Sequence, residues 1–308
     1  MGSFALWFDS NNSSCDFKAD VHFNLWNMHY KKATPTSLDI GIKINNINTS
    51  TVINIYIPFE INKSNIIDLG CRLKTSEILC SVFNEDYVVS HTGNDKKVTV
   101  TSKEGLPVMR IYCLDISNDI KIETKYDGTV ISFECLDELA NLNIPIYFRL
   151  RITSYNFRQI IKPYKPHNIF LQSAISIIEA IDFRFNDYRS LNSSLLEEMR
   201  NSISYKIGKV HFLLLTEADV DLQYSLAGVT ARELENKVWN GYFDNIFNKN
   251  IVAYHWRFSS ETSNKLIENC IMFVKTKVYR CNIKTIIIYI LILGVLTVLF
   301  NYISHLLF

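Results

Sequence analysis

The sequence contains few of the residues that build phosphate-binding loops. Only 10 of its 308 residues are glycine, and neither a G-x-x-x-x-G-K-S/T nor a G-x-G-x-x-G pattern occurs. Such loops let backbone N–H groups surround a phosphate, so their absence argues against the usual nucleotide-hydrolysing and dinucleotide-binding classes. No Ser–His–Asp or Cys–His arrangement can be recognised either. The sequence therefore predicts a protein that is not an enzyme.

Cysteine spacing also excludes several classes. The seven cysteines are odd in number and scattered, and no C-x-x-C pair occurs, which argues against a disulfide framework and against zinc knuckles. The histidines show no metal-ligand spacing, so we expect no metal centre and no cofactor. The net charge of +1 excludes a global field that would attract nucleic acid. Any nucleic-acid site must therefore be local.

One long hydrophobic run lies near the C-terminus. Residues Ile286–Phe300 carry no charge, and extension to 285–304 gives a segment of roughly 20 residues, the length that crosses a hydrocarbon core of about 30 Å. A helix satisfies its own backbone hydrogen bonds, as a membrane requires. The run predicts a single transmembrane helix within residues 282–308.

The residues that flank this run predict its orientation. Lys275, Lys277, Arg280 and Lys284 precede it, and cationic flanks stay in the cytoplasm. The N-terminus lacks the basic region of a signal peptide. We therefore expect a tail-anchored, single-pass membrane protein with residues 1–281 in the cytoplasm.

Residues 1–153 alternate between apolar and polar side chains with period two. This pattern predicts an antiparallel β-sandwich, with its longest strands at 21–25, 38–44, 52–57 and 144–152. Shorter strands are expected at 78–83, 98–101, 108–113, 120–124 and 129–135.

Residues 154–281 are predicted to form a connector and then an α/β or α+β domain. The expected strands lie at 177–185, 210–215 and 251–258. Capping boxes that begin at Ser194 and Thr230 predict helices to about Ser204 and Phe243. A last helix, capped by Ser259 or Ser260, is expected to run toward the membrane.

Cationic and aromatic residues alternate around the connector, the arrangement by which bases stack on rings while phosphates meet cations. We predict a site for a nucleotide or short single-stranded nucleic acid, with Arg149 and Arg151 on the polar face of a strand. The alternative is an ordinary linker whose rings pack and whose charges are solvated. The predicted ligand-binding residues are Arg149, Arg151, Tyr155, Arg158, Lys162, Tyr164, Lys165 and His167.

The acidic residues Glu217, Asp219 and Asp221 follow a strand that is predicted to be buried. Carboxylates in this position can bind Mg²⁺, which would suit a membrane-bound enzyme. A solvated loop is the competing interpretation, and it fits the absence of other catalytic patterns.

The predicted span has one polar stripe. Gly294, Thr297, Asn301 and Ser304 recur at spacings of three and four, so they share a helix face. Small and weakly polar residues let membrane helices approach and hydrogen-bond, which predicts a homo-oligomer and, with several copies, a pore. Asn301 and Ser304 could instead lie in the headgroup region.

These features together suggest a ligand-controlled membrane effector. The layout of a soluble sensor followed by the span at 285–304 resembles that of bacterial anti-phage membrane effectors, such as the channel components of CBASS- or Hailong-type systems. The resemblance lies in architecture and brings no family motif, so no functional residue is transferred from it. It implies a location in the inner membrane of a bacterium. The alternative is a tail-anchored adaptor that recruits protein partners to the membrane through its β-sandwich.

Overall fold

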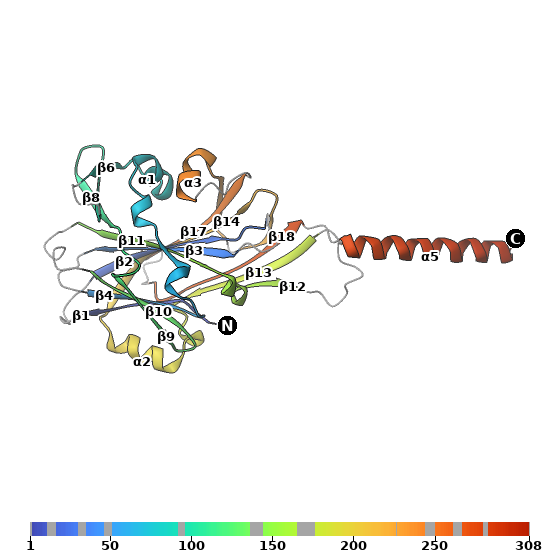
Figure 1. Cartoon of the computed structure of the whole chain (residues 1–308), viewed down its shortest axis with the longest axis horizontal. Coiled ribbons are helices and arrows are strands. Elements are labelled where there is room, and N and C mark those ends of the chain that lie inside the picture. The colour runs from blue at the N-terminus through green and yellow to red at the C-terminus, as the bar shows by residue number, and fades with distance from the viewer. Residues whose placement is uncertain are drawn as a thin grey trace.

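The computed structural model is mostly β-sheet with an apolar helix at its C-terminal end (Figure 1). It describes residues 2–10, 17–29, 35–45, 51–91, 96–135, 144–164, 176–225, 227–243, 250–260, 267–279 and 283–307. The described strands form three sheets.

The large sheet contains ten strands. In spatial order they are β16 (Thr230–Glu233), β17 (Ile251–Ser259), β14 (Tyr205–Glu217), β2 (Phe17–Trp26), β3 (Thr36–Asn45), β11 (Ile146–Ser154), β8 (Pro107–Tyr112), β7 (Lys97–Thr101) and β6 (Val88–His91), with β5 (Ile66–Asp68) paired to β11.

The other two sheets have four strands each. The β4 sheet has the order β1 (Ala5–Ser10), β4 (Thr51–Ile57), β10 (Gly128–Cys135) and β9 (Ile120–Lys125). The β18 sheet has the order β12 (Ile161–Tyr164), β13 (Ser176–Phe185), β18 (Cys270–Tyr279) and β15 (Asp221–Tyr224).

The large sheet joins the two halves of the chain. Strand β14 pairs in parallel with β2, for example at His211 and His22. The predicted boundary between residues 153 and 154 therefore does not separate the sheets. One hydrophobic core, with Phe23, Phe183 and Phe212 near its centre, is shared by all three sheets.

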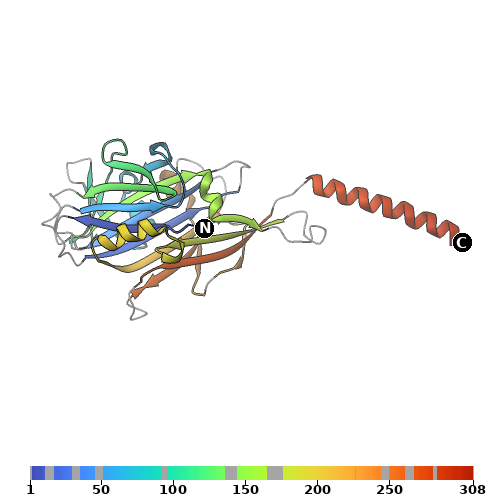
Figure 2. The ribbon, with the colours of Figure 1, turned by 90° about the horizontal axis from the view of Figure 1, so that it is seen from below.

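The helices other than the C-terminal one lie on the outer faces of these sheets (Figures 1 and 2). Helices α1 (Ser76–Phe83) and α3 (Asn236–Tyr242) cover the large sheet, where Leu79 and Trp239 join a second core with Trp26. Helix α2 (Ser193–Asn201) places Leu195 against the β4 sheet.

Three predicted elements were wrong in type. Residues 78–83 belong to helix α1, because Thr75 caps it and Asn84 ends it in the left-handed region (φ 57). Residues 230–233 form edge strand β16 along β17 rather than a capped helix turn. The expected final helix is replaced at 270–279 by strand β18, whose long pairing with β13 outweighs any local capping signal.

Helix α5 (Ile283–Leu307) is long and apolar enough to cross a membrane. Its segment Ile286–Leu307 has 22 residues and a mean hydropathy of 2.6, and none of the segment's most apolar stretch is buried against the rest of the chain. It extends away from the three sheets and their helices (the described part of residues 2–279, called the β-module below), beyond the ends of β13 and β18, in both ribbon views. An apolar helix with no protein cover is suited to lipid rather than to water.

Candidate functional site

Arg149 and Arg151 do not lie on a solvent-facing surface, so this part of the sequence prediction is wrong. Their side chains are 1% and 6% exposed, and both guanidinium groups pair with the fully buried Asp39 of β3. Arg151 donates from Nε to Asp39 Oδ1 at 2.6 Å and from Nη2 to Oδ2 at 3.0 Å. The polar face of β11 is the face that α1 and α3 cover.

The rest of this buried charge cluster consists of aromatic donors. Trp26 Nε1 and the Tyr242 hydroxyl each donate to Asp39 Oδ2 at 2.9 Å. Burial alone would raise the pKa of Asp39, but Arg151 and Arg149 outweigh burial and hold this pKa below its usual value. The cluster is internally satisfied, which is the arrangement of a structural core rather than of an open binding site.

A row of histidines continues this polar layer across the large sheet. The Tyr147 hydroxyl lies 3.3 Å from His22 Nδ1, and His211 Nδ1 lies 3.0 Å from His255 Nε2. Burial lowers the pKa of His211 to about 4 and that of His22 well below its usual value. These imidazoles are therefore neutral near pH 7 and act as packed polar residues.

A second charge cluster connects the large sheet to the β18 sheet. His29, just after β2, places Nε2 at 2.9 Å from Glu179 of β13 and Nδ1 at 3.2 Å from Glu217 of β14. Its backbone N–H also donates to Glu217 at 2.6 Å. Burial opposes the charge on His29, but the two carboxylates outweigh burial and raise the pKa of His29 to about 9. The imidazolium is thus a charged link between two sheets.

The acidic run after β14 does not converge on one point. Glu217 is buried and bound to His29, while Asp219 lies on an exposed turn. Asp221 begins β15 and accepts a hydrogen bond from the Tyr279 hydroxyl at 2.7 Å. No shared carboxylate site appears among these described residues.

The predicted connector residues are divided between two places. Tyr155 and Arg158 are exposed on a 3-10 turn (Tyr155–Gln159), where Tyr155 borders a groove with Lys63. Lys162 and Tyr164 lie instead on edge strand β12 and are exposed. Lys165 and His167 fall outside the described residues.

Lys162 and Tyr164 belong to a larger exposed surface on the outer face of the β18 sheet. Alternate residues of β18 point to this side, while Met272, Val274 and Val278 are buried on the opposite side. We call this surface the aromatic–lysine face; it carries Lys162, Tyr164, Tyr224, Phe273, Lys275, Lys277 and Tyr279. Asp182 and Asp221 lie on the same side, paired with Phe273 and Lys277.

Cations and rings are in contact on this face. Lys275 Nζ lies 5.5 Å from the centre of the Tyr164 ring and 5.9 Å from that of Phe273. Lys277 Nζ lies 4.9 Å from the centre of the Tyr279 ring. Tyr164 and Tyr279 are 53% and 50% exposed. Within the described part of the chain, neither lysine forms an ion pair, so both ammonium groups can meet a ligand anion.

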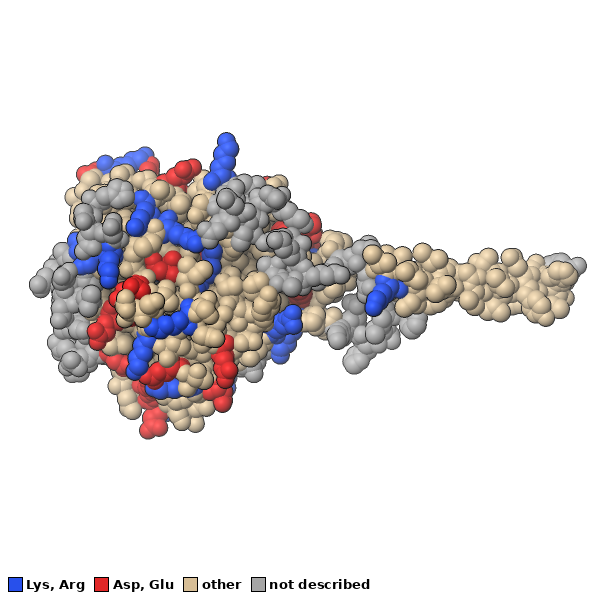
Figure 3. Space-filling model, viewed as in Figure 1, with Lys and Arg blue, Asp and Glu red and all other residues tan. Residues whose placement is uncertain are grey.

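The aromatic–lysine face was only partly predicted from sequence. The segment 273–279 alternates ring, cation, cation, ring with period two, which marks one face of a strand. The sequence analysis instead predicted a helix before the membrane span, so this alternation was not interpreted as a strand. Over the side seen in Figure 3, basic and acidic side chains are otherwise interspersed, in keeping with the small net charge.

The polar stripe of α5 lies in the exposed helix. A Cβ atom added at Gly294 would meet nothing within 4 Å. Thr297 Oγ1 donates to the Leu293 carbonyl at 2.8 Å, while Asn301 and Ser304 are exposed. The stripe is thus available to a neighbouring helix, and its role in association stays a prediction.

No protein-family model matches the chain, and no curated protein is significantly similar to it.

Proposed function

We propose that the protein is a tail-anchored membrane effector. Its β-module binds a nucleotide or a short single-stranded nucleic acid on the aromatic–lysine face. The bound state controls how the α5 helices of several copies assemble into an ion-conducting or membrane-disrupting oligomer. The β-module, a sandwich-like stack of sheets, lies on the cytoplasmic side, as the lysines before the span favour.

The observation that carries this proposal is the continuity of β18 with α5. Strand β18 supplies Phe273, Lys275, Lys277 and Tyr279 to the face and ends at Tyr279, while α5 begins at Ile283. A ligand that bridges β18 to Tyr164 on β12 therefore acts on the strand that leads into the span. Sequence-tolerant binding of single strands uses this pairing of stacked rings and lysines.

The stripe of Gly294, Thr297, Asn301 and Ser304 supports assembly of the helices. Small and hydroxyl-bearing residues at one helix face favour close contact between membrane helices, and several copies are needed to enclose a path for ions. The layout is similar to that of bacterial anti-phage membrane effectors, so we propose membrane permeabilisation as the output, at the bacterial inner membrane.

The binding half is tested on the full chain in detergent with a fluorescein-labelled oligothymidylate. Anisotropy gives the affinity of the wild type and of Lys275→Gln/Lys277→Gln. The matched control is Lys63→Gln/Lys237→Gln, which changes two exposed lysines elsewhere. We expect weaker binding only in the first double variant. Equal binding by all three proteins contradicts the proposed ligand site.

The membrane half is tested by dye release from vesicles that contain the purified chain. Thr297→Leu/Asn301→Leu is expected to abolish release while the protein still inserts. Val295→Leu/Leu299→Val, on the opposite side of α5, is the control and keeps release. If any inert apolar span can replace residues 282–308 without loss of function, the adaptor hypothesis replaces the effector hypothesis.

A further inference from the structure

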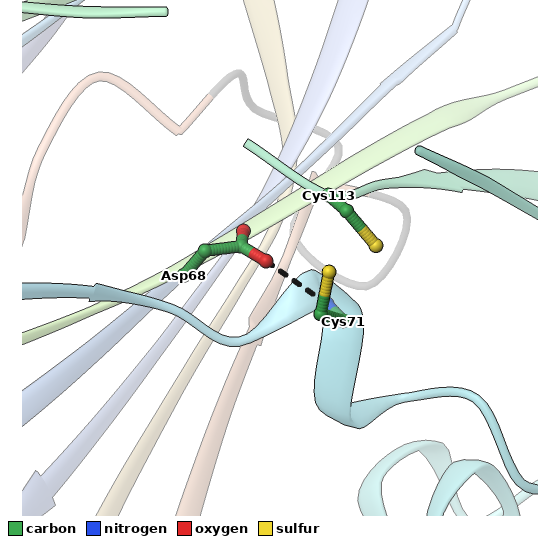
Figure 4. A group of neighbouring side chains, drawn as sticks. All are labelled: Asp68, Cys71 and Cys113. Atoms are coloured by element: carbon green, nitrogen blue, oxygen red, sulfur yellow. Dashed lines mark hydrogen bonds between the residues drawn. The ribbon is translucent and has the colours of Figure 1, made fainter. Parts of the chain in front are cut away.

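Three chemically reactive side chains meet in the large sheet where β5 and β8 both lie beside β11. Asp68 ends β5, Cys71 lies in the following 3-10 turn (Gly70–Arg72), and Cys113 follows β8. Their ligand atoms all lie within 4.8 Å of one another. Figure 4 shows the three side chains as neighbours, with the Asp68 carboxylate directed at the Cys71 turn.

The backbone around this group is built to hold it together. Asp68 Oδ2 accepts a hydrogen bond from the Cys71 N–H at 2.9 Å. A Cβ atom added at Gly70 would lie 1.9 Å from the Tyr112 carbonyl oxygen, so only glycine lets the turn approach β8 this closely. The turn is also tied to the buried charge cluster, because Leu69 N–H donates to the Arg149 carbonyl at 2.8 Å.

One atom of the group points to a ligand. Asp68 Oδ1 is inaccessible to solvent and makes no hydrogen bond of good geometry within the described part of the chain, although the Gly70 and Leu114 N–H groups lie near the carboxyl group. A buried carboxylate oxygen without a partner is costly. Cys71 is exposed whereas Cys113 is buried, so the group opens to solvent on one side.

We propose that Asp68, Cys71 and Cys113 form a zinc-binding site. Zinc takes thiolate and carboxylate ligands at about 2.3 and 2.0–2.2 Å in a tetrahedron, which places ligand atoms roughly 3.5–4 Å apart. Small side-chain movements therefore suffice to bring the three ligand atoms to zinc-binding distances. The fourth position faces solvent beside Cys71 and takes a water molecule. The bound ion fixes the 70–72 turn against the end of β8.

Sequence spacing could not reveal the site, because Cys71 and Cys113 come from separate segments that only the fold brings together.

The test uses the full chain in detergent, reduced, stripped of metal and free of a polyhistidine tag. Titration with Co²⁺ is expected to give a thiolate-to-cobalt charge-transfer band with one ion per chain. Zn²⁺ is expected to remove this band and to raise the melting temperature. Cys71→Ser and Asp68→Asn are expected to weaken binding at least tenfold, while Cys80→Ser, in α1, keeps it. Because Cys71 is exposed, its replacement should not impair folding. The melting temperature of the metal-free variant checks this.

Three results would overturn the proposal. The first is a wild-type chain without the charge-transfer band, and the second is a Cys71→Ser chain with the wild-type affinity. The third is recovery of Cys71 and Cys113 as a disulfide, together with a reduced chain that fails to bind Co²⁺, which would identify a redox pair instead.

Discussion

Two clusters in this molecule combine cations with aromatic rings, and they differ in what neutralises the cations. In the buried charge cluster, Arg151 lies 3.8 Å from the centre of the Phe243 ring and pairs with Asp39. On the aromatic–lysine face, Lys275 lies 5.5 Å from the Tyr164 ring centre and forms no ion pair with any described carboxylate. The presence of rings beside cations therefore does not identify a ligand site. What distinguishes a ligand site is whether a protein carboxylate already neutralises the cations and whether other elements cover them.

The two clusters should respond differently to mutation. Removal of one partner from a buried ion pair leaves an uncompensated charge and costs about 3–5 kcal/mol. Exposed cation–ring contacts contribute about 0.5–1 kcal/mol. The first cluster should therefore control stability, and the second should control binding.

The largest effect is expected from Asp39→Asn. The change leaves Arg151 and Arg149 buried without a negative partner, and it should destabilise the protein by about 3–5 kcal/mol. Urea unfolding of the full chain in detergent measures this. Asp86→Asn, which breaks only an exposed pair with Lys103, is the control, and a similar loss in both variants would contradict the comparison.

The next effect concerns His29, which links the large sheet to the β18 sheet. Its pKa is raised from 6.5 to about 9, so its contribution is complete below pH 6.5 and is lost as the pH rises through about 9. The shift corresponds to about 3 kcal/mol.

Unfolding measured between pH 6 and pH 10 tests this link. The wild type should lose stability across that range, whereas His29→Gln should show a flatter profile. Gln keeps hydrogen-bonding capacity but cannot carry the charge. Parallel profiles for the two proteins would show that His29 is not the titrating group.

The strands around the buried charge cluster show where sequence reasoning succeeded and where it failed. Alternation of side chains correctly predicted strands β2, β3, β4 and β11, because a pleated strand places successive residues on opposite faces. The same alternation placed Arg149 and Arg151 on a polar face. It could not reveal that α1 and α3, from distant segments, cover that face, nor that Asp39 on β3 lies opposite Arg151.

The aromatic–lysine face was only partly predicted, also because the fold brings distant segments together. Lys162 and Tyr164 were predicted from local composition, but Lys275 and Lys277 were interpreted only as flanks of the span. Pairing of β13 with both β12 and β18 places the four residues on one face. Strand pairing over long separation is a tertiary property that local composition does not encode.

A smaller effect is expected from Gly41→Ala, which probes the packing of the polar layer. An added Cβ atom would lie 2.1 Å from the Tyr147 hydroxyl oxygen, which also accepts from Arg149 at 2.8 Å. Overpacking of this kind costs about 1–3 kcal/mol. The double variant Gly41→Ala/Tyr147→Phe should recover part of the loss in urea unfolding, and no recovery would place the strain elsewhere.

The smallest effect on stability is expected from Lys275→Gln/Lys277→Gln, and this variant separates the two clusters most clearly. Both side chains are partly exposed and pack only against ring faces, so unfolding should change by less than about 1 kcal/mol. Binding of an oligothymidylate should nevertheless weaken, and the slope of log affinity against log salt should fall by about 1.4, since each phosphate contact on a single strand contributes about 0.7. A large loss of stability with an unchanged salt slope would mean that the aromatic–lysine face, like the buried charge cluster, serves the fold rather than a ligand.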